Sequence, residues 1–161
     1  MTHNETGAGA RLRISWWMVS FAGLFGVLMG LGFFTFGFAR GASYFSDNPE
    51  TCMNCHIMRD QFEAWRHSSH ARVATCNDCH TPHDFVNKWI IKGVNGWNHS
   101  VAFTLGNFHE PIRIRDFNAD VVQQSCVYCH QNIVSVLDGP HATEPTQCIA
   151  CHSSVGHRTR Q

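Results

Sequence analysis

The strongest pattern of hydrophobic and polar positions lies near the N-terminus. No charged residue occurs from Ile14 to Ala39. A helix over this stretch would be roughly 39 Å long, which is enough to cross a hydrocarbon core of about 30 Å with some tilt. Trp16 and Trp17 stand at its start, where aromatic residues are typical of a membrane interface. The pattern predicts a transmembrane helix over residues 14–39.

The charges nearest to this stretch indicate its orientation. They are all arginines: Arg11, Arg13 and Arg40. Two precede the stretch and one follows, so the positive-inside bias places residues 1–13 in the cytoplasm and residues 40–161 in the periplasm. The alternative is a cleaved signal peptide ending at Gly37-Phe38-Ala39. The apolar core of a signal peptide runs only about 7–15 residues, so we expect an uncleaved anchor.

The chain after residue 40 has a different pattern. It shows no sustained alternation of apolar and polar residues, so no β-sheet is predicted. Helices are predicted over residues 59–67, 84–105 and 119–129, with loop signals at 46–49, 106–107 and 138–140. A chain this short and fragmented cannot build a conventional apolar core. We therefore expect a small, mostly helical and irregular domain whose interior is filled by something other than side chains.

Charge and composition narrow the function. Lysine plus arginine and aspartate plus glutamate both number 12, so the net charge is zero. That balance argues against nucleic-acid binding, which needs an excess of positive charge on one face. The unusual counts are 8 cysteines and 12 histidines in 161 residues. A specific chemistry has to account for them.

All the cysteines fall in four copies of the pattern C-x-x-C-H. The pairs are Cys52 and Cys55, Cys76 and Cys79, Cys126 and Cys129, and Cys148 and Cys151. This pattern is the signature of c-type haem attachment, because two thiols on one helical turn reach both vinyl groups of a porphyrin. Structural zinc and disulfides are the alternatives, but neither needs a histidine after every second cysteine. The sequence predicts four covalently attached haems and a multihaem cytochrome c.

Four haem irons have eight axial positions, and the motif histidines supply up to four of the ligands. The other histidines after residue 40 are His67, His70, His83, His99, His109, His141 and His157. A lone histidine is usually just solvated, so most of these need no special role. One that lies near a haem edge is the exception.

The anchor followed by four motifs resembles the NapC/NirT family of membrane-anchored tetrahaem quinol dehydrogenases. The first motif continues as Cys52-Met-Asn-Cys55-His56-Ile57-Met58, and the segments from His67 to Ala71 and from Gly96 to Gly106 are also similar. Within the family, these features resemble the small subunit of cytochrome c nitrite reductase. The chain is too short for the pentahaem members.

The resemblance implies a set of iron ligands. They are Met58 for haem 1, His80 and His157 for haem 2, His130 and His70 for haem 3, and His152 for haem 4. Haem 1 would keep its other face open or nearly open beside a quinol pocket. The second ligand of haem 4 stays open between the partner subunit, His109 and His141. The resemblance gives no ligand role to His67 or His83.

The family's quinol site implies two further residues. A lysine twelve positions after the second motif histidine corresponds to Lys92, whose ordinary alternative is an interfacial lysine that extends its charge to water. A carboxylate seven positions further on corresponds to His99 instead, or to Asn95 if one insertion is allowed. His99 would then accept a proton or ligate the iron of haem 1.

The implied function is oxidation of menaquinol from the membrane quinol pool at the cell inner membrane. Electrons would pass along four haems to the catalytic subunit of a periplasmic multihaem nitrite reductase, which makes ammonium from nitrite, in a hetero-oligomer. One alternative is an electron-carrier or docking subunit without a quinol site of its own. Another is a family relative that serves a different periplasmic reductase.

Overall fold

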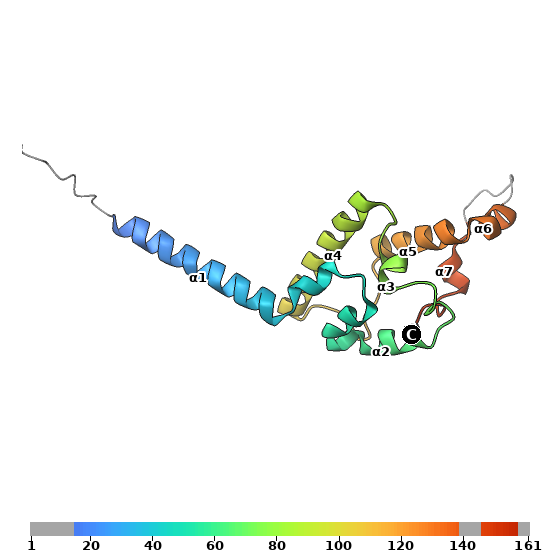
Figure 1. Ribbon diagram of the computed structural model, residues 1–161, viewed down its shortest axis with the longest axis horizontal. Coiled ribbons are helices and arrows are strands. Elements are labelled where there is room, and N and C mark those ends of the chain that lie inside the picture. Colours follow the sequence, from blue (N-terminus) through green and yellow to red (C-terminus); the bar gives the residue numbers. More distant parts are fainter. Residues whose placement is uncertain (1–14, 139–145, 158–161) are drawn as a thin grey trace, which may run out of the picture. The chain divides into compact units, whose positions relative to one another are not determined.

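The computed structural model describes residues 15–138 and 146–157, and it divides the chain into two compact units, Met1–Gly41 and Ala42–Gln161. Among the described residues the regular elements are all helical, so the predicted absence of a sheet is confirmed. The loop predicted at 138–140 lies mostly outside the described residues. Figure 1 labels the helices along the chain.

The first unit contains one long helix, α1, from Trp16 to Phe38 (Figure 1). Its 23 residues are apolar or small, and every one of them is exposed. A helix that is apolar all round needs an apolar environment on every side. At about 34 Å, α1 is long and apolar enough to cross a membrane, although it is slightly shorter than the predicted 14–39.

The second unit is built from helices, most of which are short. They are η1 (Gly41–Phe45, beginning at the last residue of the first unit), η2 (Pro49–Asn54), η3 (His56–Met58), α2 (Arg59–Arg66), α3 (Cys76–His80), α4 (Phe85–Leu105), α5 (Asp116–Cys129), α6 (Gln131–Leu137) and α7 (Cys148–Cys151). The predicted helices correspond to α2, α4 and α5, of which α5 begins three residues earlier than expected. The three predicted ranges did not include η1, η2, η3, α3, α6 or α7.

Local signals explain where α4 begins and ends. The side chain of Asp84 accepts a hydrogen bond from the backbone N–H of Asn87 at 2.9 Å, which satisfies one of the open donors at the helix start. The helix ends at Gly106, which adopts a left-handed conformation with φ of 64°. Its N–H donates to the carbonyl of Ala102 at 2.8 Å, and glycine adopts this conformation without a Cβ penalty.

The second unit encloses very little apolar side-chain surface. In the described part of the chain, the buried hydrophobic residues are Phe62, Ile91 and Val121, and no side chain falls below 2 % exposure. A domain of about 120 residues normally buries a continuous core. This sparse interior is what a polypeptide has when prosthetic groups supply most of the core.

Candidate functional site

The four C-x-x-C-H motifs lie in contact in the order in which they occur along the chain. The first cysteine of motif 1 is in η2, motif 2 forms α3, motif 3 ends α5, and the cysteines of motif 4 bound α7. Helix η2 contacts α3, α3 contacts α5, and α5 contacts α7. Groups held by these motifs would therefore form a continuous series rather than separate sites.

The thiols show the same order. The neighbouring Cys76 thiol is the main cause of the lowered pKa of Cys52, so motifs 1 and 2 are close. Burial, and after it the nearby Cys126, raise the pKa of the Cys79 thiol, so motifs 2 and 3 are also close. Burial and then Cys148 raise the pKa of Cys126 in the same way. No disulfide joins any of the eight cysteines, so each is available for thioether formation.

Motif 4 is attached to α5 by one glutamine. The side-chain amide of Gln123 donates to the carbonyl of Thr146 at 2.8 Å, and its oxygen accepts from the backbone N–H of Cys148 at 2.9 Å. Helix α7 has only four residues and no side-chain cap of its own. Gln123 therefore contributes much of what fixes the start of this motif.

Two pairs of histidine rings have a spacing that fits a haem iron between them. The rings of His80 and His157 are nearly parallel, with centroids 6.0 Å apart and planes 8° apart. The rings of His70 and His130 have centroids 6.2 Å apart. Imidazole nitrogens bond a transition metal at about 2.0–2.1 Å, so two rings on opposite faces of one iron have centroids about 6 Å apart. The residues present therefore fit bis-histidine haems.

Direct ring stacking in this domain has a different spacing. His83 stacks on Tyr128 with centroids only 4.1 Å apart, which leaves no room for an atom between the rings. His83 is thus engaged with an aromatic side chain. The centroid distances of the two histidine pairs, 6.0 and 6.2 Å, are therefore too long for direct stacking.

His80 has the protonation state that a ligand needs. Burial, and then the neighbouring His157, lower the pKa of His80 to about 4. The imidazole is therefore neutral at physiological pH and keeps a lone pair on one nitrogen. Metal binding requires that form.

The other predicted ligands, Met58 and His152, lie at motifs 1 and 4. Met58 is half-buried at the end of η3, and its backbone N–H donates to the carbonyl of Cys55 at 2.9 Å, within one turn of motif 1. His152 follows α7 and is exposed, and His109 is exposed in the segment after α4. His141 lies outside the described residues.

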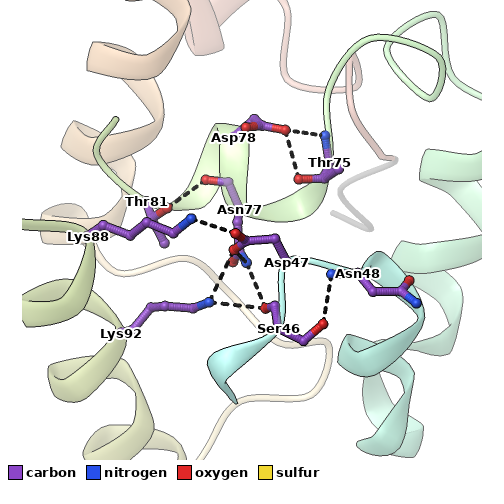
Figure 2. A network of polar contacts seen from close by, with 9 residues as sticks. All are labelled: Ser46, Asp47, Asn48, Thr75, Asn77, Asp78, Thr81, Lys88 and Lys92. Atoms are coloured by element: carbon purple, nitrogen blue, oxygen red, sulfur yellow. Dashed lines mark hydrogen bonds and ion pairs between the residues drawn. The ribbon is translucent and has the colours of Figure 1, made fainter. Parts of the chain in front are cut away.

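Lys92 is the most buried ionisable side chain of α4, with 7 % exposure. Its ammonium group donates to the carbonyl of Ser46 at 3.1 Å and lies 3.4 Å from Oδ1 of Asp47 (Figure 2). It also lies 5.3 Å from the centroid of the Trp89 ring. Lys92 is therefore held inside the domain and does not extend to solvent as an interfacial lysine would.

Asp47 connects three elements of the domain. Lys88 donates to Oδ2 of Asp47 at 2.8 Å, and the side chain of Asn77, in motif 2, donates to Oδ1 at 2.6 Å (Figure 2). The hydrogen bond from Lys88, with further contributions from Asn77 and from the charges of both lysines, lowers the pKa of Asp47, although desolvation acts in the opposite direction. Sequence reasoning missed this residue, because it assigned residues 46–49 only to a loop.

His99 lies two turns beyond Lys92 on α4 and contacts Tyr44. The Tyr44 hydroxyl and Nδ1 of His99 are 2.6 Å apart. Burial first, and then Cys55 and Cys52, raise the pKa of Tyr44 to about 12, which places the phenol beside motif 1. Burial and then Arg115 lower the pKa of His99. Sequence reasoning did not identify Tyr44, because a tyrosine 55 positions from its partner gives no local signal.

The residues from Tyr44 to Asp47, named here the strap, run along α4. A Cβ added at Gly96 would come within 3.3 Å of the Tyr44 ring, so glycine allows this close approach. The rings of Phe45 and Trp89 lie 5.8 Å apart. The strap thus supplies a polar partner to Lys92 and to His99.

Asn95, the alternative to His99, faces elsewhere. Its side-chain amide exchanges two hydrogen bonds, of 3.0 and 3.1 Å, with Asn118 of α5. That reciprocal pair joins α4 to α5. Asn95 has no contact with the strap among the bonds of the described residues.

An apolar helix of membrane-spanning length, followed by a small helical domain of contiguous C-x-x-C-H motifs, defines a multihaem cytochrome c. The family model described as "NapC/NirT cytochrome c family, N-terminal region" matches residues 13–119. The chain belongs to the NapC/NirT cytochrome c family, which confirms the family resemblance.

Individual relatives agree with this assignment. The chain is 38 % identical over 145 residues to the cytochrome c-type protein NrfH of Wolinella succinogenes, covering 83 % of this chain and 82 % of the relative. It is 30 % identical over 119 residues to the cytochrome c nitrite reductase subunit NrfH of Nitratidesulfovibrio vulgaris, covering 74 % and 72 %. A solved structure, the cytochrome c nitrite reductase NrfHA complex bound to the inhibitor HQNO, matches with a TM-score of 0.61 and 26 % identity, covering 89 % of this chain and 93 % of the other. Within the family the chain is most like NrfH.

Proposed function

We propose that this protein is anchored in the inner membrane, oxidises menaquinol there, and passes electrons through four covalent haems to a periplasmic nitrite reductase subunit. The observation that carries the proposal is the position of Lys92 and His99, which lie on α4 close to the first of four attachment motifs in continuous contact. The similarity to NrfH and to the NrfHA complex supports the choice of partner.

In this proposal the chain's own residues hold each haem. The cysteines of each motif form the thioethers. Met58 is the proposed ligand of haem 1, His80 with His157 hold haem 2, His130 with His70 hold haem 3, and His152 lies on haem 4. The 6.0 and 6.2 Å ring separations support the two bis-histidine pairs. Residues 1–13 would be cytoplasmic, 14–39 the anchor and 40–161 the periplasmic domain.

Lys92 would bind the quinol. Its ammonium has three N–H donors, two of which are used by Ser46 and Asp47. The third would donate to a quinol oxygen and stabilise the negative charge that develops there as the proton leaves. The pKa of the Cys52 thiol is lowered to about 7, mainly by the neighbouring Cys76 thiol and to a lesser degree by Lys92, so this ammonium is near motif 1.

His99 would accept a proton. Oxidation of one quinol releases two electrons and two protons, and the haems supply one-electron acceptors when bound. When Nδ1–H of His99 donates to the Tyr44 oxygen, Nε2 keeps a lone pair and can take a proton from the quinol. Because His99 is exposed, it can release the first proton to solvent before it takes the second. The raised pKa of Tyr44 keeps that hydroxyl protonated throughout. An imidazole suits this task because its unperturbed pKa is close to ambient pH, and the lowered pKa of His99 keeps the ring neutral and able to accept a proton.

The test is the rate at which a menaquinol analogue reduces the haems of the full-length protein in membranes. Lys92→Gln should slow reduction on the order of 100-fold, and His99→Ala should also slow it, while dithionite still reduces every haem. Because the pKa of His99 is lowered, the wild-type rate should hold below pH 6.5 and then fall as pH falls through that pKa. The exposed Arg113→Gln is the charge-matched control.

Two results would contradict this function. If Lys92→Gln and His99→Ala both leave the quinol rate unchanged, the protein is an electron-carrier subunit without its own quinol site. If His99→Ala creates a high-spin signal in electron paramagnetic resonance, His99 is an iron ligand and not a proton acceptor. Co-elution of a multihaem nitrite reductase from detergent extracts tests the partner, and a different reductase in that fraction would replace it.

A further inference from the structure

The buried ammonium group of Lys92 needs a counter-charge. A buried charge is costly unless it is paired and hydrogen-bonded. The ion pairs of the described residues give Lys92 a single carboxylate, that of Asp47, with Lys92 8 % and Asp47 55 % exposed at the side chain. The position seven residues after Lys92, where the family resemblance implies a carboxylate, holds His99 instead. Asp47 therefore supplies the negative charge from a different element.

Asp47 is itself held firmly in place. Its two oxygens are contacted by three donors, from Lys88, Lys92 and Asn77. Asn77 also donates to the carbonyl of Ser46 at 3.2 Å, the same carbonyl that accepts from Lys92 (Figure 2). Because Asn77 belongs to motif 2, this network connects the proposed quinol lysine to the second haem-attachment motif.

The charges around Asp47 and its lowered pKa indicate which role its carboxylate can have in the site. The two lysines and Asp47 together carry a net charge of +1, which favours a developing quinol anion. Hydrogen bonding from Lys88, and less from Asn77 and the lysine charges, lowers the pKa of Asp47 and makes it a poor proton acceptor. Proton transfer is thus left to His99.

We propose that Asp47 is a positioning residue of the quinol site, whose carboxylate orients the Lys92 ammonium so that its remaining N–H meets the quinol oxygen. This inference rests on the proposed quinol oxidation. The family resemblance implies one carboxylate at position 99 of α4. In this chain Asp47 of the strap supplies the carboxylate, and His99 of α4 supplies the proton acceptor. Asp47 acts through Lys92 and does not touch the substrate.

The experiment is a double-mutant cycle on the full-length, haem-loaded protein in membranes, with the initial rate of haem reduction measured against menaquinol-analogue concentration. Asp47→Asn removes the charge and keeps the shape, and it should lower kcat/KM on the order of 10-fold, since small misplacements of a binding group are costly. In the Lys92→Gln background the same change should have no further effect. Asp47→Glu should restore part of the rate.

Controls separate positioning from a general structural role. Asp84→Asn makes the same chemical change at the start of α4, where asparagine caps as well as aspartate, and it should leave the rate unchanged. Dithionite reduction and the haem content of Asp47→Asn should equal those of wild type. If Asp47→Asn does not mature, Asp47→Glu in both backgrounds provides the same cycle.

Each outcome decides between the two proposals. An unchanged rate in Asp47→Asn overturns the positioning role. A loss of equal size in the wild-type and Lys92→Gln backgrounds also overturns it, because Asp47 would then act independently of Lys92. If Lys92→Gln alone has no effect, the proposed quinol site fails and the role of Asp47 fails with it.

Discussion

Helix α1 and the domain that follows it differ in what covers their apolar surface. Every residue of α1 is exposed, although the helix is apolar along its length. In the domain, large side chains such as Val73 and Val136 are about 80 % exposed, and few are buried. In the described part of the chain, neither unit encloses most of its own apolar side chains.

The two units differ in the kind of apolar environment that each one needs. A helix that is apolar all round satisfies its backbone internally and needs only a hydrocarbon environment, which a bilayer provides without specific contacts. The domain needs flat apolar groups at defined places, because its motifs and ring pairs lie at fixed spacings. The bilayer thus covers the apolar surface of α1 without specific contacts. In the domain, haems held at defined positions take the place of a side-chain core.

The largest expected effect comes from removing haem attachment. Cys76→Ser with Cys79→Ser eliminates motif 2, which lies between motifs 1 and 3, so the domain should lose its core and become protease-sensitive while the chain stays in the membrane fraction. Intact mass should exceed the polypeptide mass by about four haems in wild type. Cys148→Ser with Cys151→Ser, in α7, should have a smaller effect. Equal protease resistance in all three proteins would show that the haems do not supply the core.

An intermediate effect is expected from a charge in the anchor. Leu28→Arg, near the middle of α1, should cost about 2.5–3.5 kcal/mol of membrane insertion. The measurement is the fraction of protein that resists carbonate extraction. Trp17→Arg, at the end of the same helix, is the control and should have little effect because the side chain can reach the interface. Full extraction of the wild-type protein would show that α1 is not a membrane anchor.

The smallest expected effect is local to α4. Asp84→Ala removes the side-chain acceptor for the Asn87 N–H and should lower the free energy of unfolding by about 1 kcal/mol. Thermal unfolding of the haem-loaded protein measures it. Haem spectra and membrane binding should not change, because the Asp84 hydrogen bond is local to the first turn of α4. A loss as large as that of the motif 2 variant would mean that polypeptide packing, and not haem, dominates the stability.

Local sequence features were sufficient for much of this protein. The apolar stretch predicted α1 because lipid solubility depends on composition along one helix, and C-x-x-C-H predicted the attachment sites because both thiols lie on one turn. Asp84 and Gly106 similarly mark the start and the end of α4 by local signals in the sequence. The ligand sets came from family resemblance, since His80 and His157 carry no local signal of pairing.

The tertiary structure alone decided the partners of the proposed quinol residues. Asp47 and Lys92 are 45 positions apart, and Tyr44 and His99 are 55 apart. Nothing in the loop signal at residues 46–49 distinguishes an aspartate that ends a turn from one that neutralises a buried lysine. The short helices α6 and α7 were also missed, because so few residues show no periodic pattern. Such features depend on which segments the chain brings together, and a contact between distant segments leaves no trace in the pattern of either segment alone.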